Sequence, residues 1–154
     1  MASIYNTAEL GFLTDNIENI IKDNGIKLIL VDSLIAHFRA EYTKTSNLPE
    51  RQRAIHKIMT ALLTFARLYG VAVVVTNHVQ DVPTGWNNKA LSRRLHGIPT
   101  GGNVMAHDST YRIFLRRSDL WSGTALILSS PYHPTGQIQF DITERGIDNA
   151  ERSW

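Results

Sequence analysis

Residues 27–33 read Lys-Leu-Ile-Leu-Val-Asp-Ser, and this stretch decides the fold class. A continuous run of branched apolar residues is typical of a strand buried on both faces, as in a parallel sheet that helices cover. A second run of this kind, Val71–Val75, follows a long amphipathic segment. Two buried strands separated by a helix predict a right-handed parallel crossover, and therefore an α/β fold.

The segments around these strands predict the remaining elements. Asn6 or Thr7 is a candidate N-cap for a helix that Asn24-Gly25 ends, and a long helix opens near Pro49. We also expect a short strand at 2–5, a looser segment at 34–47, and strands at 111–115, 125–128 and 137–142, the first two of these joined by a turn at 119–123. The apolar stripe of the long helix consists of Ile55, Ile58, Met59, Leu62, Leu63 and Ala66.

Length and composition predict one domain. The 154 residues are 43% hydrophobic, which suffices for a single core of ordinary size, and the chain shows no repeat or linker, so the predicted domain is 1–154. No apolar run approaches a membrane span and the first residues do not resemble a secretory signal, so we expect an intracellular address, in cytoplasm, nucleus or nucleoid. The absence of cysteine excludes disulfides and thiolate zinc sites.

Positive charge is concentrated in the middle of the chain. Sixteen basic and fourteen acidic residues leave a net charge of only +2, so a site for a polyanion must be local. The region around residues 81–102 has the glycines and prolines of a long loop, which is usually functional. The basic residues between positions 89 and 117 face a single acid, Asp108, and they are Lys89, Arg93, Arg94, Arg112, Arg116 and Arg117.

Asp32 is the first candidate functional residue. A carboxylate at the carboxyl end of a parallel strand lies where such sheets bind ligands, and we predict that it holds magnesium. The usual companion, a Gly-x-x-x-x-Gly-Lys-Ser/Thr loop that cradles phosphates, occurs nowhere in these 154 residues, and only a helix and a short extended piece precede the strand. The sequence therefore predicts half of a nucleotide site.

Simpler interpretations stand beside this one. Asp32 could merely end a strand and cap the next segment. His78 and His107 could join Asp32 in a metal site, but no His-x-x-x-His pair is present, so hydrogen-bonding or sensor roles are favoured. Trp86 could stack on a base or pack against the body of the protein. Nucleophilic catalysis has no support, because the chain lacks cysteine and a Gly-x-Ser-x-Gly elbow.

Six short strings stand out along the chain. They are 31–33 Val-Asp-Ser, 37–42 His-Phe-Arg-Ala-Glu-Tyr, 48–52 Leu-Pro-Glu-Arg-Gln, 73–77 Val-Val-Val-Thr-Asn, 101–110 Gly-Gly-Asn-Val-Met-Ala-His-Asp-Ser-Thr and 142–147 Ile-Thr-Glu-Arg-Gly-Ile. In order and spacing they resemble the archaeal and eukaryotic branch of RecA-type recombinases, RadA-like proteins above all. The resemblance covers nearly the whole chain, from Ala2 to about Asn149.

The resemblance implies a fold and an activity. The fold would be a three-layer, mostly parallel RecA-like sheet flanked by helices, with a C-terminal β-hairpin region and without the phosphate-loop strand. Proteins of this kind bind ATP and Mg²⁺ between neighbouring subunits of a filament on DNA and exchange homologous strands. The implied partners are single- and double-stranded DNA and either the chain itself or a complementary fragment in a filament, with no membrane.

The resemblance also assigns residues. Asp32 would be the magnesium ligand, Asn77 and His78 would lie at the sensor strand, and His107 would face the nucleotide of an adjacent subunit. Asp32, Ser33, Ser129 and Pro131 would contact the nucleotide. Segments 42–51 and 80–102 resemble two DNA-binding loops, in which cations neutralise phosphates and a branched side chain wedges between bases. The DNA-binding positions would be Lys44, Arg51, Val82, Lys89, Arg93, Arg94, Gly101 and Gly102.

The chain departs from the family pattern at several positions. His78 stands where the family has glutamine, Thr45 where the first loop has arginine, and Ser129 where an aspartate helps to cap the neighbouring ATP. Three hypotheses follow. The chain is the carboxyl-terminal piece of a recombinase that a segment with a phosphate loop completes; or it is an ATP-independent DNA-binding or regulatory paralogue; or it is a remnant or interaction module.

Overall fold

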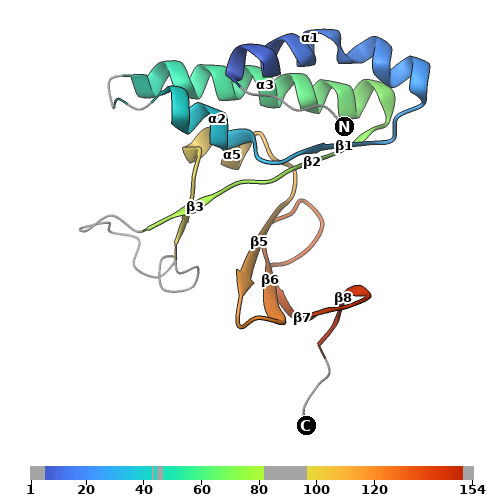
Figure 1. Ribbon diagram of the computed structural model, residues 1–154, viewed down its shortest axis with the longest axis vertical. Helices are drawn as coiled ribbons and strands as arrows, with labels where there is room; N and C mark the ends of the chain where they lie inside the picture. The colour runs from blue at the N-terminus through green and yellow to red at the C-terminus, as the bar shows by residue number, and fades with distance from the viewer. Residues whose placement is uncertain (1–5, 43, 45–46, 82–96, 151–154) are drawn as a thin grey trace. The chain divides into compact units, whose positions relative to one another are not determined.

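The computed structural model describes residues 6–42, 44, 47–81 and 97–150. The chain divides into two compact units, of which the described part of unit 1 covers residues 6–81, with the gaps just given, and residues 97–108, and that of unit 2 covers residues 109–150. Helices and strands both contribute, as Figure 1 shows, and this confirms the α/β composition. The expectation of a single domain over 1–154 is untested and stays a prediction. Within the described residues, no helix is long and apolar enough to cross a membrane.

Helix α1 (Thr7–Asn24) begins and ends where the sequence predicts. Asn6 is the N-cap, because its side chain accepts a hydrogen bond of 2.8 Å from the backbone N–H of Glu9. Gly25 ends the helix with a φ of +60°, a left-handed conformation that glycine adopts without steric cost. Of the two predicted caps, Asn6 is therefore confirmed. The strand expected at 2–5 lies outside the described residues.

Two parallel strands form the sheet of unit 1. Strand β1 (Leu28–Val31) pairs with β2 (Ala72–Val75), with Leu28 opposite Ala72 and Val31 opposite Val75. Helix α3 (Leu48–Tyr69) lies between them in sequence, has Pro49 in its first turn, and ends at Gly70, whose φ is +61°. The predicted parallel crossover is confirmed.

The segment expected to be loose, 34–47, is partly helical. Helix α2 (Leu34–Glu41) occupies its first half, so this expectation was wrong there. Leu34, Ile35 and Phe38 are buried and share one face of the helix, since they are spaced one, three and four residues apart. The sequence signal was short, and burial of these three side chains decides the conformation.

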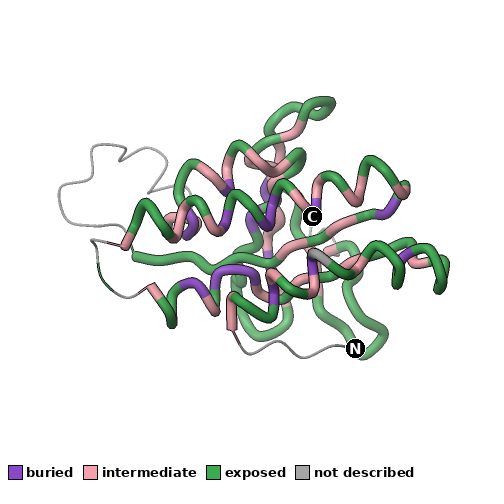
Figure 2. The backbone as a smooth tube through the Cα atoms, turned by 90° about the horizontal axis from the view of Figure 1, so that it is seen from above, coloured by how far each residue is buried: buried purple, intermediate pink, exposed green. Residues whose placement is uncertain are grey.

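The hydrophobic core of unit 1 lies between its helices and one face of β1 and β2. Ile29, Val31, Val73 and Val75 point from the strands toward this core. Figure 2 shows that buried and exposed residues alternate along the helices, as expected for helices with one covered face. The buried members of the core are Leu10, Leu34, Ile35, Phe38, Ile55, Ile58, Met59, Leu62 and Met105.

The opposite face of the two strands is open. Helices α1 and α3 both lie on one side of β1 and β2 (Figure 1). On the other side Leu30 and Val74 are 66% and 50% exposed, and Leu28 is also exposed. The expectation that both strands are buried on both faces was therefore wrong for the part of the chain that the structure describes.

Two short strands and a short helix complete unit 1. Strand β3 (Val79–Gln80) pairs in antiparallel fashion with β4 (Ile98–Pro99). Helix α5 (Gly102–His107) follows, and its Met105 is buried in the core. Most of the predicted long loop, residues 82–96, lies outside the described residues.

Unit 2 is a four-stranded antiparallel sheet in the order β5-β6-β7-β8. The three strands expected here are confirmed as β5 (Arg112–Arg117), β6 (Ser122–Ser129) and β7 (Gln137–Thr143), and the structure adds β8 (Gly146–Asn149). The expected turn joins β5 to β6, because Asp119 accepts hydrogen bonds from the backbone N–H groups of Trp121 and Ser122.

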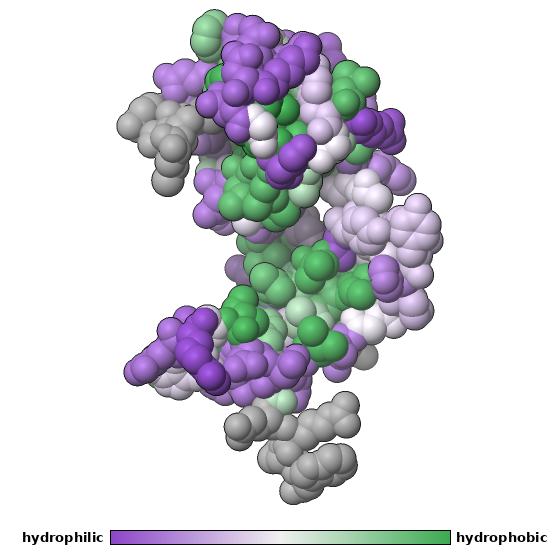
Figure 3. All heavy atoms as spheres, turned by 90° about the vertical axis from the view of Figure 1, so that its right-hand side faces the viewer, coloured by the Kyte–Doolittle hydropathy of each residue, from purple (hydrophilic) through white to green (hydrophobic). Residues whose placement is uncertain are grey.

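The two faces of the sheet of unit 2 also differ. Phe114 and Leu126 are buried on one face, with Leu128 packed against them. On the other face Phe140 lies over Gly123, where an added Cβ would approach the ring Cζ to 2.4 Å. Figure 3 shows apolar residues at the surface of both units, and in unit 2 the exposed ones include Ile113, Leu115, Ile138 and Ile147.

The expected mostly parallel sheet is found only at β1 and β2. Every other described strand pair is antiparallel, including all pairs of unit 2. In unit 2 the reason is the connection length, since short turns join consecutive strands in antiparallel pairs, whereas a parallel pair needs a crossover such as α3.

Candidate functional site

The site forms where the two parallel strands end. Because β1 and β2 are parallel, the residues that follow them, Asp32 and Thr76, lie at the same edge of the sheet. The Thr76 hydroxyl donates a hydrogen bond of 2.5 Å to Oδ1 of Asp32, and the Thr76 backbone N–H donates to the carbonyl of Val31 at 2.9 Å. The Asp32–Ser33 peptide bond is cis. Sequence reasoning found Asp32 and missed the role of Thr76.

The next residues of both segments also meet. Oγ of Ser33 and Nε2 of His78 lie 2.7 Å apart and share a hydrogen bond. The backbone N–H of His78 donates to Oδ1 of Asn77 at 2.8 Å. Of the predicted catalytic and nucleotide-binding residues, the structure thus brings four together at this edge, namely Asp32, Ser33, Asn77 and His78.

Thr100 joins this edge to the end of the long loop. Its hydroxyl donates to Oδ1 of Asn77 at 2.7 Å, and Nδ2 of Asn77 donates to the Thr100 carbonyl, also at 2.7 Å. The Thr100 backbone N–H donates to the carbonyl of His78 at 2.9 Å. The Thr100 side chain is buried, whereas Asn77 and His78 are exposed, so these bonds are partly buried. Its position between Pro99 and two glycines was the only sequence signal.

The donor set at this edge suits Mg²⁺. This ion prefers oxygen ligands and is commonly held by one or two carboxylates together with substrate phosphates. Asp32 is exposed, and within the described residues its Oδ2 accepts no hydrogen bond, so that oxygen is available to a cation. No group of three or more His, Cys, Asp or Glu side chains gathers in the described part of the chain.

Three predicted residues have no hydrogen bond to this network within the described residues. His107 is exposed at the end of α5, and in the described chain no hydrogen bond joins it to Asp32, Asn77 or His78. Ser129 ends β6 and Pro131 follows it, both exposed and both in unit 2. Their predicted contacts with the nucleotide stay predictions.

Four of the predicted DNA-binding positions can be placed. Lys44 is exposed, and Arg51 lies in the first turns of α3. The neighbour of Arg51, Gln52, lies against Gly102, where an added Cβ would be 3.5 Å from the amide nitrogen. Nε of Arg51 and Oε1 of Gln52 are buried and have no hydrogen-bond partner among the described residues.

Gly101 and Gly102 have φ values of +89° and +62°, conformations that favour glycine. Both glycines therefore follow a buried threonine, and Gly102 lies beside the Gln52 side chain. Sequence reasoning missed Gln52. The remaining predicted DNA-binding positions, together with Trp86, lie outside the described residues; they are Val82, Lys89, Arg93 and Arg94.

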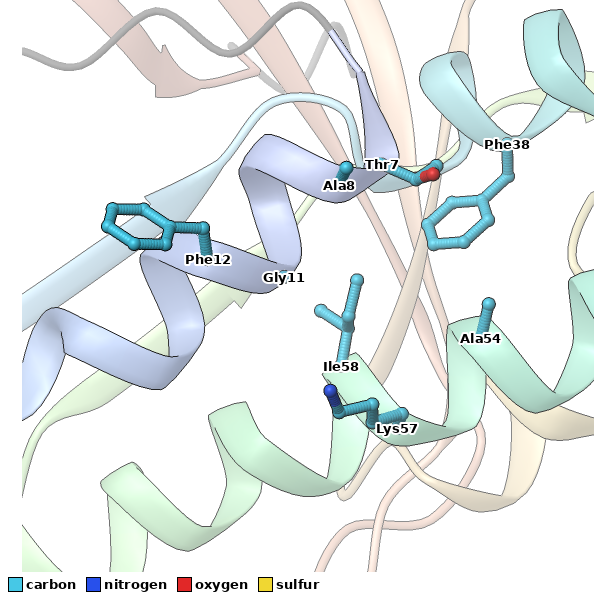
Figure 4. Close-up of a pocket in the computed structure, with 8 residues that line it drawn as sticks. All are labelled: Thr7, Ala8, Gly11, Phe12, Phe38, Ala54, Lys57 and Ile58. Carbon is cyan, nitrogen blue, oxygen red and sulfur yellow. The ribbon is translucent and has the colours of Figure 1, made fainter.

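A groove of about 370 Å³ lies elsewhere in unit 1, between α1, α2 and α3. Figure 4 shows Phe12 of α1, Phe38 of α2 and Ile58 of α3 around it, with Lys57 as the one cation in its lining. None of the residues that line it is a predicted site residue. Thr7 and Lys57 are the polar side chains among its lining residues.

A comparison with protein families gives one finding. A sequence model described as Rad51 matches residues 1–150, which is nearly the whole chain.

Proposed function

The chain belongs to the Rad51 family of recombination and repair proteins, and from this premise we propose that it acts in DNA recombination and repair. The proposed activity is RadA-like, namely ATP-dependent homologous pairing and strand exchange on single-stranded DNA. It requires completion by a segment that carries the phosphate loop. Filament formation with such a segment or with further copies of the chain is part of the proposal.

One observation carries the proposal, namely the hydrogen-bonded edge from Asp32 to Thr100. Asp32 and Ser33 follow β1, Thr76 to His78 follow β2, and Thr100 follows the long loop. His78 is bonded directly to Thr100, and Asp32 is linked to it through Thr76 and Asn77, so a change at either residue can reach Thr100, the residue before the two glycines. Such an arrangement suits a protein in which a nucleotide at one end alters DNA binding at the other.

The proposed ATP site is only half supplied by these residues. The 154 residues contain no Gly-x-x-x-x-Gly-Lys-Ser/Thr motif, so the backbone amides and the lysine that grip phosphates must come from another segment. The exposed side chains of Leu28, Leu30 and Val74 give that segment an apolar face to cover. Burial of a side chain of this kind contributes about 1.5–3 kcal/mol when complete.

The residues of this chain would act by binding and positioning. Asp32 would hold Mg²⁺ through its carboxylate, with Thr76 fixing the orientation of that carboxylate. The ion, when bound, neutralises charge on the phosphate oxygens during phosphoryl transfer. His78 would sense the nucleotide through the bond that it now makes to Ser33.

DNA binding is proposed for Arg51, Gln52 and the exposed Gly102, and Gly101, which is buried beside Gly102, stays a predicted contact. The guanidinium is a cation for phosphate neutralisation, and glycine lets a phosphodiester approach the backbone closely. Nε of Arg51 and Oε1 of Gln52 have no hydrogen-bond partner among the described residues, so a donor and an acceptor remain unused at this site. Arg93 and Arg94 are proposed as further phosphate contacts.

Substitution of Asp32 tests the nucleotide half of the proposal. The chain is mixed with a fragment that carries a strand followed by the phosphate loop, and ATP turnover is measured. We expect Asp32→Ala to abolish turnover. The matched variant Asp32→Asn keeps an acceptor for the Thr76 hydroxyl but lacks the charge that holds magnesium, so it should be equally inactive. Normal turnover in Asp32→Asn would reduce Asp32 to a structural cap.

Arg51→Ala tests the DNA half. We expect weaker binding to all DNA sequences and a salt dependence reduced by about one unit of slope. Arg53→Ala is the matched control, because Arg53 is an exposed arginine two residues along the same helix, and residues two apart do not share a face. Equal effects of the two substitutions would remove Arg51 from the site.

A second candidate function is ATP-independent DNA binding by a regulatory paralogue. The bond between Ser33 and His78 favours it, since the sensor position is already occupied within this chain. In that case the chain alone binds DNA with the usual salt dependence, and Mg-ATP has no effect on the affinity. Failure of the chain to bind DNA even at low salt would favour an interaction module instead.

A further inference from the structure

Helix α3 contacts both ends of the short helix α5. Gln52 lies against Gly102, the first residue of α5. One turn further along α3, Nδ1 of His56 lies 2.7 Å from Oδ2 of Asp108, the residue that caps the end of α5. Gln52 and His56 are four residues apart and therefore lie on the same face of α3.

The middle of α5 is held by the core. Met105 is buried there, and Gly101 leaves it room, because an added Cβ at Gly101 would lie 2.3 Å from Cγ of Met105. A helix of six residues has no stability of its own in water, so its position depends on contacts with the rest of the protein. The buried Met105 side chain holds α5 against the core, and the hydrogen bond between His56 and Asp108 holds the C-terminal end of α5 against α3.

The geometry of this bond is specific. The Asp108 side chain is 18% exposed and that of His56 is 61% exposed, so the carboxylate is largely shielded while the imidazole faces water. The short distance requires a proton between Nδ1 and Oδ2, which both the charged ring and the neutral ring with Nδ1–H supply. Asp108 is also the last residue of unit 1, before the chain passes into unit 2.

We propose that His56 and Asp108 form a bridge that positions α5 for DNA binding. The two glycines at the start of α5 and His107 at its end belong to the DNA and nucleotide contacts of the proposed function, on which this inference rests. His56 is a positioning residue, because it acts through Asp108 and touches neither DNA nor nucleotide. The bridge keeps Gly102 of α5 against Gln52 of α3, the residue after Arg51, while Gly101 packs against Met105.

Simple electrostatics makes the opposite prediction for Asp108. If this carboxylate acted only by its charge, its removal would strengthen the binding of a polyanion. If it positions α5, its removal weakens binding, although the protein becomes more positive. The sign of the effect therefore separates the two roles.

A double-mutant cycle tests the bridge in the full chain. The affinity for a single-stranded oligonucleotide at low salt is measured for the wild type, His56→Ala, Asp108→Ala and the double variant. We expect each single substitution to weaken binding about two- to fivefold, the range that a partly exposed ion pair supports. The double variant should bind no more weakly than the weaker single variant. Independent effects that multiply, or tighter binding by Asp108→Ala, would overturn the proposal.

Two further variants keep the test specific. His56→Asn retains a side-chain N–H donor near the position of Nδ1 and should recover most of the affinity lost in His56→Ala. A loss as large as that of the alanine variant would contradict a role for the hydrogen bond. Asp23→Asn removes one exposed carboxylate from the end of α1 and should not weaken binding, so it controls for the change in charge.

Hydrogen exchange separates failure of this inference from failure of the proposed function. If the wild type binds no DNA, the proposed function fails, but the bridge is still measurable in the free chain. We expect amides of residues 102–108 to exchange faster in His56→Ala than in the wild type or in His56→Asn. Unchanged exchange in His56→Ala would show that α5 does not depend on His56.

Discussion

The two faces of the β1–β2 pair have the same kind of residues and opposite surroundings. On the covered face Ile29, Val31 and Val73 pack against the helices, whereas on the open face Leu30 and Val74 are exposed to water. Strands with apolar residues on both faces are typical of sheets with helices on both sides. The described elements therefore cover only one of the two apolar faces of these strands.

The polar edge of the same strands gives a contrast. There, Asp32, Ser33, Asn77 and His78 already have partners within the chain. The hydrogen bonds at the carboxyl ends of β1 and β2 are therefore formed even though the open face of the strands is exposed. We infer that a segment with the phosphate loop would add the groups that bind phosphate and would cover the open face of the strands. The hydrogen bonds at this edge would stay unchanged.

The largest expected effect is on the covered face. Ile55 is fully buried in the core, so Ile55→Ala should lower the free energy of unfolding by about 2–5 kcal/mol, the usual cost of such a truncation. Leu30→Ala on the open face is the matched control and should cost less than about 1 kcal/mol in the chain alone. Chemical denaturation measures both. Similar losses would mean that the two faces do not differ.

Gly101→Ala tests how tightly α5 is joined to the covered core. The new Cβ would meet Met105 and Ile35 in a residue whose φ is +89°, and we expect a loss of about 1–3 kcal/mol in unfolding free energy. Gly25→Ala is the control, because its φ of +60° is strained but nothing lies within 4 Å of the added Cβ. If the two variants lose the same stability, packing beside Met105 is not close.

A polar substitution on the open face should matter only when that face is covered. Leu30→Thr should leave the unfolding midpoint of the chain alone almost unchanged, since the side chain is already in water. It should weaken association with a phosphate-loop fragment, measured by titration calorimetry. Thr60→Ser, at an exposed position of α3, should leave association unchanged. Equal affinities for wild type and Leu30→Thr would place the fragment elsewhere.

The smallest effect belongs to the outer surface of the covering helices. Hydrogen bonds from Lys22 and then from Tyr69 hold the pKa of Glu18 below its usual value of 4.5. Because the folded pKa is the lower one, the stabilisation is present above pH 4.5 and is lost as the pH falls through the folded value. Glu18→Gln should slightly lower the midpoint of thermal unfolding at pH 7 and leave it unchanged at pH 3. A difference that persists at pH 3 would exclude this ionisation as its source.

The sequence predicted the elements whose signals are long or chemically distinctive. The strand that ends at Asp32, the helix between Asn6 and Gly25, and the helix that opens at Pro49 are found with nearly the expected bounds. Apolar periodicity, a capping side chain and glycine at a left-handed position are local properties, so they can be read without a structure.

Long-range partners could not be predicted in the same way. The bonds from Thr100 to Asn77 and from His56 to Asp108 join residues 23 and 52 positions apart. The neighbouring sequence does not show which of these residues pair, and only the packing of α3, α5 and the strands brings them together. The same reason explains why α2 was missed, since its three buried residues have meaning only against the core.

Hydrogen exchange along β1 and β2 tests the central claim most directly. The full chain is measured alone and with a fragment that carries a strand and the phosphate loop. We predict slower exchange at the amides of residues 28–31 and 72–75 when the fragment is present, because a neighbouring strand and an apolar cover would shield the open face. Unchanged exchange at these strands, with the fragment in saturating amount, would contradict the proposal that a segment with the phosphate loop covers this face.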